Sequence, residues 1–133
     1  MALSLNLTIK KGPALYEAWT TDIPGIYGTG KTVEEAKKDI ENTIKEIKDG
    51  KYGDVVPVEL QGEIEFVLNL DIQSFLELYS YISKSALENI TGVNQKLLGH
   101  YASGLKKPRK AQIEKIESSL RIFLDDLKKV HII

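Results

Sequence analysis

The chain has no cysteine, only two histidines and no long apolar run. Without cysteine there is no disulfide framework, no thiolate zinc site and no cysteine nucleophile. His100 and His131 alone do not predict a histidine metal site, and we expect no metal and no cofactor. No run approaches the roughly 18–20 apolar residues that span a bilayer, and residues 1–11 alternate apolar and polar side chains, unlike a signal peptide. We therefore expect a cytoplasmic protein with no membrane partner.

Charge is balanced over the whole chain but unevenly distributed along it. The 18 Lys and Arg face 19 Asp and Glu, which gives a net charge of −1. Residues 1–70 hold 8 Lys against 12 acidic residues, a balance of −4, whereas residues 71–133 hold 10 basic against 7 acidic residues, a balance of +3. Within 84–115, seven basic residues face only Glu88 and Glu114. This asymmetry indicates two domains, 1–70 and 71–133, of which the second is suited to a polyanion.

Residues 1–70 have the pattern of a small α+β domain in the order β-β-β-α-β. Alternating or aromatic-rich runs predict strands over 3–9, 14–19, 26–29 and 64–70. The run T-V-E-E from Thr32 is a capping box, and the apolar spacing after it predicts a helix over 33–48. The stretch 51–62, with Pro57 inside it, is predicted to be a loop.

The first domain shows no recognisable catalytic site. Its carboxylates fall mostly at turns and on the helix surface, no histidine accompanies them, and the ligand cluster of a metal-dependent nuclease cannot be assembled from them. The run G-T-G-K-T at 28–32 lacks the spacing of a P-loop and is interpreted as a strand end followed by a helix cap. We expect a protein that is not an enzyme, and keep a metal-dependent nuclease as a third hypothesis.

Residues 71–133 have the pattern of an all-α domain with a helix-turn-helix. A helix after Asp71 is predicted by the apolar residues Ile72, Phe75, Leu76, Tyr79 and Ile82. Two short helices joined at Gly92 follow, with Asn94 as the N-cap of the second helix and Gly104 as its C-terminal stop. A last helix over 109–130 carries a long apolar stripe, which favours a dimer.

A helix-turn-helix places its second helix in the major groove, where glutamine can pair with adenine and lysine with guanine. Basic residues in the following loop would contact phosphates. The predicted DNA-binding residues are Asn94, Gln95, Lys96, His100, Ser103, Lys106, Lys107 and Arg109. Helix pairs with a glycine turn also occur in bundles that bind no DNA. For the basic run 106–110, the alternative interpretation is a solvated loop that contacts no phosphate.

These motifs resemble the HicB family of antitoxins over nearly the whole chain. The resemblance lies in D-I-P-G at 22–25, G-K-T-V-E-E-A at 30–36, T-G-V-N-Q at 91–95 and H-Y-A-S-G-L-K-K-P at 100–108. It implies a partial RNase H-like fold without nuclease carboxylates in 1–70, which would cover a HicA-type toxin that cleaves mRNA. It also implies that 71–133 binds operator DNA, that the protein represses its own operon, and that it assembles as a homodimer or homotetramer.

A second hypothesis from the residues is a stand-alone helix-turn-helix transcription regulator. Its sheet domain would then serve assembly or the sensing of a small ligand. Glu88 is one departure from the usual pattern, because many helix-turn-helix proteins carry a small residue four positions before the turn glycine. The two leading hypotheses differ in whether a toxin partner exists.

Overall fold

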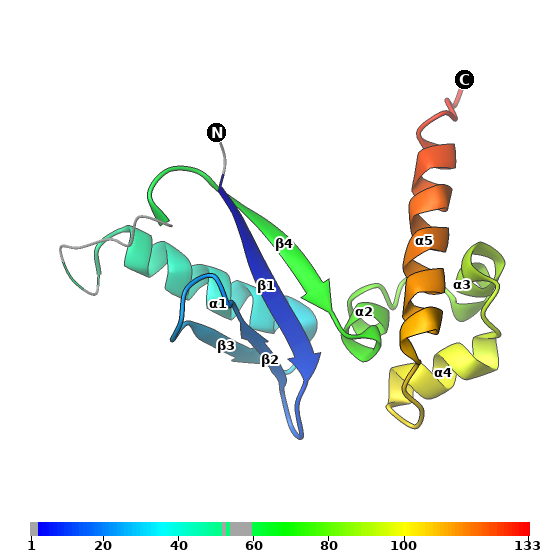
Figure 1. Ribbon diagram of the computed structural model, residues 1–133, viewed down its shortest axis with the longest axis horizontal. Helices are drawn as coiled ribbons and strands as arrows, with labels where there is room; N and C mark the ends of the chain where they lie inside the picture. Colours follow the sequence, from blue (N-terminus) through cyan, green and yellow to red (C-terminus); the bar gives the residue numbers. More distant parts are fainter. Residues whose placement is uncertain (1–2, 52, 54–59) are drawn as a thin grey trace. The chain divides into compact units, whose positions relative to one another are not determined.

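The computed structural model describes residues 3–51, 53 and 60–133, and within them the chain is an α+β protein with a four-stranded mixed sheet and five helices (Figure 1). This confirms the predicted fold class at that level. The predicted loop residues 52 and 54–59, including Pro57, lie outside the described residues. The elements are β1 Leu3–Lys11, β2 Tyr16–Trp19, β3 Tyr27–Gly30, α1 Val33–Lys48, β4 Ile64–Leu70, α2 Ile72–Leu78, α3 Lys84–Thr91, α4 Gln95–Ser103 and α5 Lys110–Leu127.

The chain forms two compact units, Met1–Leu78 and Tyr79–Ile133, which we call the sheet unit and the helical unit. The boundary lies after α2, later in the chain than the division at Leu70 that the charge pattern suggested. Helix α2 belongs with the sheet because the carboxylate of Glu77 accepts a hydrogen bond from the Val33 N–H at 3.0 Å. The Leu76 side chain is also buried.

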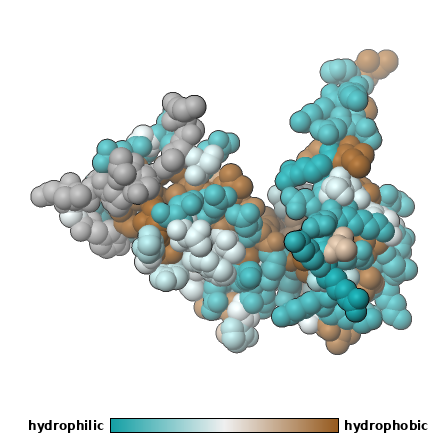
Figure 2. Space-filling view, viewed as in Figure 1, coloured by the Kyte–Doolittle hydropathy of each residue, from teal (hydrophilic) through white to brown (hydrophobic). Residues whose placement is uncertain are grey.

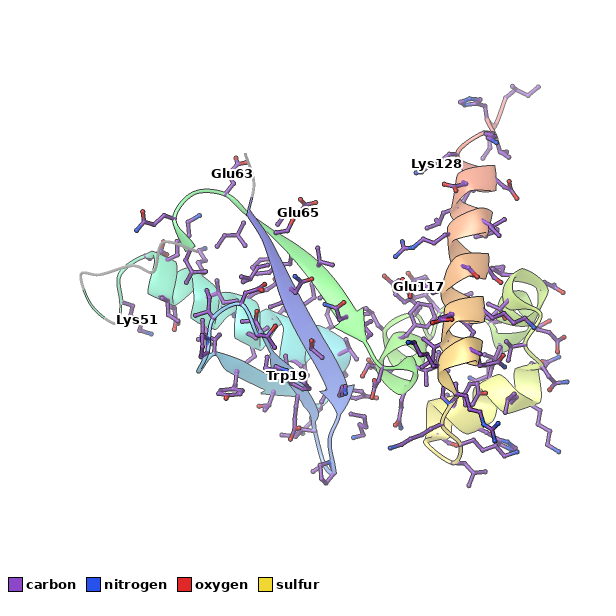
Figure 3. The ribbon with its side chains drawn as sticks, viewed as in Figure 1. Trp19, Lys51, Glu63, Glu65, Glu117 and Lys128 are labelled. Carbon is purple, nitrogen blue, oxygen red and sulfur yellow. The ribbon has the colours of Figure 1, made fainter. Side chains whose placement is uncertain are left out.

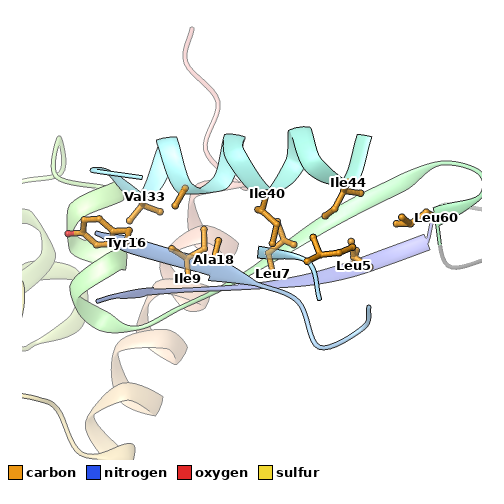
Figure 4. Close-up of a cluster of buried hydrophobic side chains, with 11 residues drawn as sticks. Leu5, Leu7, Ile9, Tyr16, Ala18, Val33, Ile40, Ile44 and Leu60 are labelled. Carbon is orange, nitrogen blue, oxygen red and sulfur yellow. The ribbon is translucent and has the colours of Figure 1, made fainter. Parts of the chain in front are cut away.

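In the sheet unit the strands lie in the order β3-β2-β1-β4. β1 is antiparallel to β2 and parallel to β4, and β2 is antiparallel to β3. Alternation along the strands sends one set of side chains toward α1, as expected from the period-two pattern. The core between the sheet and α1 is shown in Figure 4, and it includes Leu5, Leu7, Ile9, Tyr16, Ala18, Val33, Ile40, Ile44 and Leu60.

Helix α1 packs very closely on β3 because two glycines of that strand face it. A Cβ atom built on Gly28 would lie 2.6 Å from the backbone nitrogen of Ile40, and one on Gly30 would lie 2.5 Å from that of Ala36. No side chain fits in this space. As a result α1 contacts β3 and β2 far more than β1. Glycine therefore serves here to let a helix approach a strand.

The run G-T-G-K-T at 28–32 is a strand end followed by a helix cap, as predicted. The Thr32 hydroxyl accepts the Glu35 N–H at 3.1 Å and begins α1, which covers the residues expected. In a capping box the Glu35 carboxylate would accept the N–H of the cap residue, Thr32. Here it accepts the N–H of the residue before it, Lys31, at 2.7 Å.

Tyr16 closes the core at one end of β2 and is almost completely buried. The Lys11 ammonium lies 4.9 Å from the centre of its ring. Burial raises the pKa of the Tyr16 phenol above its ordinary value, and the nearby carboxylates of Glu77 and Asp71 raise it further. The phenol is therefore neutral in the folded protein through the physiological pH range.

The helical unit has a small core of its own, formed where α3 packs on α4 and α5. Its buried side chains are Leu87, Val93, Leu98, Tyr101 and Ile116. Ile116 is the buried residue of α5, and much of the predicted apolar stripe on that helix is exposed.

Some predicted element ends differ from the structure. The helix after Asp71 ends at Leu78, so Tyr79 and Ile82 lie outside it. A turn closed by the Ile82 N–H on the Tyr79 carbonyl at 2.9 Å follows, and Ser83 then takes an extended conformation to cap α3. A continuing helix would deny Ser83 that conformation. β2 begins at Tyr16 rather than residue 14, and α5 spans 110–127 rather than 109–130.

Replacing Gly28 with alanine should destabilise the protein, because the new methyl group collides with the backbone of α1. We expect a loss of about 1–3 kcal/mol in the free energy of unfolding, as for other overpacked sites. Thr29→Ala is the matched control, since its exposed side chain lies on the other face of β3. Urea unfolding measures both, and an equal effect of the two substitutions would contradict the close packing of α1 on β3.

Candidate nucleic-acid interface

Three residues, 92–94, join α3 to α4 in a tight turn. Gly92 ends α3 with φ of 74°, a left-handed conformation that glycine adopts without strain. The buried Thr91 hydroxyl donates to the Leu87 carbonyl at 2.7 Å and accepts the Val93 N–H at 3.1 Å. These bonds hold the turn, and the turn sets where α4 begins. Short turns of this kind, with glycine, are typical of helix-turn-helix motifs.

Two side chains cap the beginning of α4. The Asn94 amide oxygen accepts the Lys96 N–H at 2.8 Å, which confirms Asn94 as the predicted N-cap. The Glu88 carboxylate, from α3, accepts the Gln95 N–H at 3.0 Å. A negative charge at this end also interacts favourably with the helix dipole. Glu88 thus has a role that the sequence did not reveal, because its partner lies across a turn on another helix.

Four of the predicted DNA-binding residues come together around one open hollow of about 260 Å³. The hollow is lined by Asn94, Lys96, Leu97, His100 and Lys106. The backbone N–H of Lys106 bonds to the His100 carbonyl at 3.2 Å, which holds the basic loop against the last turn of α4. Residues from a helix start, a helix middle and a following loop are therefore adjacent, and two of them are cations.

His100 lines this hollow and also carries a buried, unpaired polar atom. Its ring nitrogen Nδ1 is buried and has no hydrogen-bond partner within the part of the chain that the structure describes. The residue as a whole is partly exposed. Buried polar atoms are nearly always hydrogen-bonded, so this unpaired nitrogen is an exception in the helical unit.

The other four predicted residues are exposed but do not line the hollow. Gln95 lies in the first turn of α4, and Lys107 and Arg109 lie in the loop before α5. The Ser103 hydroxyl donates to the His100 carbonyl at 3.2 Å and accepts the Leu105 N–H at 3.4 Å. Ser103 therefore has a local role at the end of α4.

Two further lysines border the helix pair. A Cβ atom on Gly99 would lie 4.0 Å from the Lys84 side chain, and one on Gly92 would lie 3.7 Å from the Lys115 ammonium. Gly99 lies on α4 between Gln95 and Ser103, partly buried beside the Lys84 side chain, and a methyl group would fit there. Glycine inside a helix costs roughly 0.5–1 kcal/mol relative to alanine, and the packing around position 99 does not require it.

The described residues hold no group of three histidine, aspartate or glutamate side chains placed to bind a metal. None of the helices in the described ranges is long and apolar enough to cross a membrane. Comparison with family models, curated proteins and solved structures gives no match. The resemblance to HicB antitoxins therefore depends on the motifs of this chain alone.

Glu88→Ala should weaken the helical unit by about 1 kcal/mol, because the Gln95 N–H at the start of α4 loses its carboxylate partner. Asn89→Ala is the control, since Asn89 is the neighbouring exposed residue of α3. Thermal unfolding of both variants measures the difference. If Glu88→Ala is no less stable than Asn89→Ala, the carboxylate does not contribute to holding α4.

Proposed function

We propose that this protein is an antitoxin of the HicB type that also represses its own operon. In this proposal the sheet unit, as a partial RNase H-like domain, covers a HicA-type toxin that cleaves mRNA. The helical unit, as a helix-turn-helix domain, binds operator DNA. The observation that carries the DNA-binding part is the hollow at which Asn94, Lys96, His100 and Lys106 meet.

The distribution of charge between the two units supports separate partners. Residues 1–78 hold 8 Lys against 14 Asp and Glu, a balance of −6, and residues 79–133 hold 10 Lys and Arg against 5 acidic residues, a balance of +5. Together these values give the net charge of −1. The asymmetry is larger than for the division at Leu70. An acidic unit attracts a basic protein, and a basic unit attracts nucleic acid.

In the proposed complex, the first turns of α4 enter the major groove. Gln95 and Lys96, at the start of this helix, are within reach of base edges, while Lys106, Lys107 and Arg109 contact phosphates. The Glu88 carboxylate beside Gln95 opposes this attraction, because it places a negative charge near the DNA. It would therefore limit binding to arbitrary sequences.

Helix α5 supports assembly with a second copy. Its exposed apolar side chains, with Val130 just beyond its end, are Ile113, Ile122, Phe123, Leu124, Leu127 and Val130. In Figure 2 brown hydrophobic atoms interrupt the teal surface of the helix that extends toward the C-terminus. Two half-sites on DNA require two helix-turn-helix motifs, so a dimer through α5 suits the proposal. Light scattering that finds a monomer at micromolar concentration would contradict it.

Two substitutions should separate base reading from phosphate contact. Gln95→Ala should relax base preference at one position and cost roughly 1–3 kcal/mol if the glutamine pairs bidentately. Lys107→Ala should weaken binding to all sequences similarly and flatten the dependence of affinity on salt. Fluorescence anisotropy with the operon's own upstream DNA and a scrambled duplex, at several salt concentrations, measures both effects.

Lys128→Ala is the matched control for Lys107→Ala. Lys128 is an exposed lysine at the far end of α5 in the same unit (Figure 3). Its removal should leave affinity and salt dependence almost unchanged. If neither Gln95→Ala nor Lys107→Ala differs from this control, α4 and its following loop do not form the DNA interface.

The antitoxin part is tested with the neighbouring reading frames. We expect a frame beside this gene to encode a short basic chain with a histidine, and that chain to cleave mRNA and to co-purify with this protein. Adding the full chain should stop the cleavage, and Lys107→Ala should stop it equally well, because that residue lies in the helical unit. If no such partner is encoded or bound while operator binding persists, the stand-alone regulator is the correct function.

A further inference from the structure

The two edges of the sheet differ in their hydrogen bonding. At the β3 edge, the Thr29 N–H donates to the Asp39 carboxylate of α1 at 2.9 Å. β4 pairs with β1 along all seven of its residues, and within the described part of the chain its other edge has neither a strand nor a hydrogen-bond partner. An open strand of this length presents a row of backbone groups to another strand.

β4 also lacks the features that usually protect an open edge. Its sequence, I-E-F-V-L-N-L, contains no lysine, proline or glycine and a single charge. The side chains that face the core are only partly buried, and they are Ile64, Phe66, Leu68 and Leu70. Their neighbours Leu5 and Leu7 on β1 are fully buried. On the open face of the sheet, the Val67 side chain is 42% exposed.

The incomplete burial has a structural cause. α1 lies mainly over β3 and β2, so it covers β4 least. The core at the β4 side is therefore open along both its backbone edge and its apolar row. A partner strand that continues the sheet would hydrogen-bond to the free backbone groups of β4. It would also extend the apolar row of β4.

We propose that β4 pairs antiparallel with β4 of a second copy, about a two-fold axis at Val67. This register is the one that pairs all seven residues. It places Ile64 opposite the partner's Leu70 and Phe66 opposite the partner's Leu68. A two-fold axis perpendicular to the sheet keeps side chains on their own face, so the two apolar rows join. The result is a continuous sheet with four strands from each copy.

The charge pattern of β4 fits a second copy as the occupant. Glu65 is the one charged residue of the strand, and its side chain points away from the sheet near the beginning of β4 (Figure 3). In the proposed register Glu65 faces the partner's Asn69, an uncharged hydrogen-bonding side chain, rather than another glutamate. Like charges directly opposite each other would destabilise the pair. In this register the strand is thus complementary to itself in polarity.

This pairing goes beyond the proposed function and does not depend on it. It needs no DNA and no toxin, and it uses a surface of the sheet unit rather than the stripe on α5. Both contacts acting together would link copies into an assembly larger than a dimer. Separate experiments therefore test operator binding and β4 pairing, and one can fail without the other.

The absence of cysteine allows a direct test with single cysteines in the full chain. Residues opposite each other in antiparallel strands have Cα atoms about 4.5–5.5 Å apart, within the range of a disulfide. Val67→Cys should therefore form a covalent dimer under mild oxidation at micromolar protein. Glu65→Cys should not, because its copies would lie roughly 13 Å apart along the strand at about 3.3 Å per residue. Thr29→Cys, on β3, is a second control.

Non-reducing electrophoresis reads the result. A dimer from Val67→Cys with monomer from both controls supports the proposed register, and a mixture of Glu65→Cys with Asn69→Cys should also cross-link. Equal cross-linking of Val67→Cys and Glu65→Cys would mean parallel pairing or random collision and would overturn the proposal. Monomer from Val67→Cys would overturn it too, as would a cross-link from Thr29→Cys of equal yield.

Charge substitutions at exposed positions give a second measurement without oxidation. Asn69→Glu places a glutamate opposite the partner's Glu65 at two symmetric points, and should weaken self-association through β4 roughly tenfold. The double variant Glu65→Lys, Asn69→Glu should restore it, because opposite charges then face each other. Sedimentation measures the association. If the double variant associates no better than Asn69→Glu, residues 65 and 69 do not face each other.

Discussion

The arrangement of the sheet unit depends on the close approach of α1 to β3. Gly28 and Gly30 present no side chains, so the backbone of the helix lies directly on the strand. From this position Asp39 reaches the Thr29 N–H and pairs one backbone group of that edge of the sheet. The same position leaves the apolar row of β4, at the other edge, only partly covered. A larger residue in β3 would move the helix and change both edges together.

In the helical unit the comparable constraint is the turn between α3 and α4. Three side chains make it rigid: Thr91 bonds on both sides of the turn, Asn94 caps the next helix, and Glu88 takes a second N–H of that helix. The start of α4 is therefore held by its own cap residue and by side chains of α3. Preorganisation of this kind lowers the entropy lost on binding, because the exposed residues of α4 do not need to be ordered first.

Much of this fold is local and could be read from the chain. Thr32, Asn94 and Gly104 lie at the helix ends expected from capping, because a cap bonds within three residues of itself. The alternation of apolar and polar residues identified the strands because this pattern also depends only on neighbours in the chain. Leu60 was missed, although it is completely buried, since it lies inside the stretch 51–62 that was predicted to be a loop and shows no periodic pattern. Glu88 was missed because its partner is on a different helix.

The sequence by itself determined the α+β class, the order of the elements, their caps and the separation of acidic from basic residues. These properties depend on neighbours in the chain or on composition. Only the tertiary structure decided that α2 belongs with the sheet, through Glu77 and Val33. It likewise decided which of the predicted binding residues meet around His100, and that β4 is an edge strand among the strands described. Such features depend on contacts between residues distant in the chain, for which no local pattern exists.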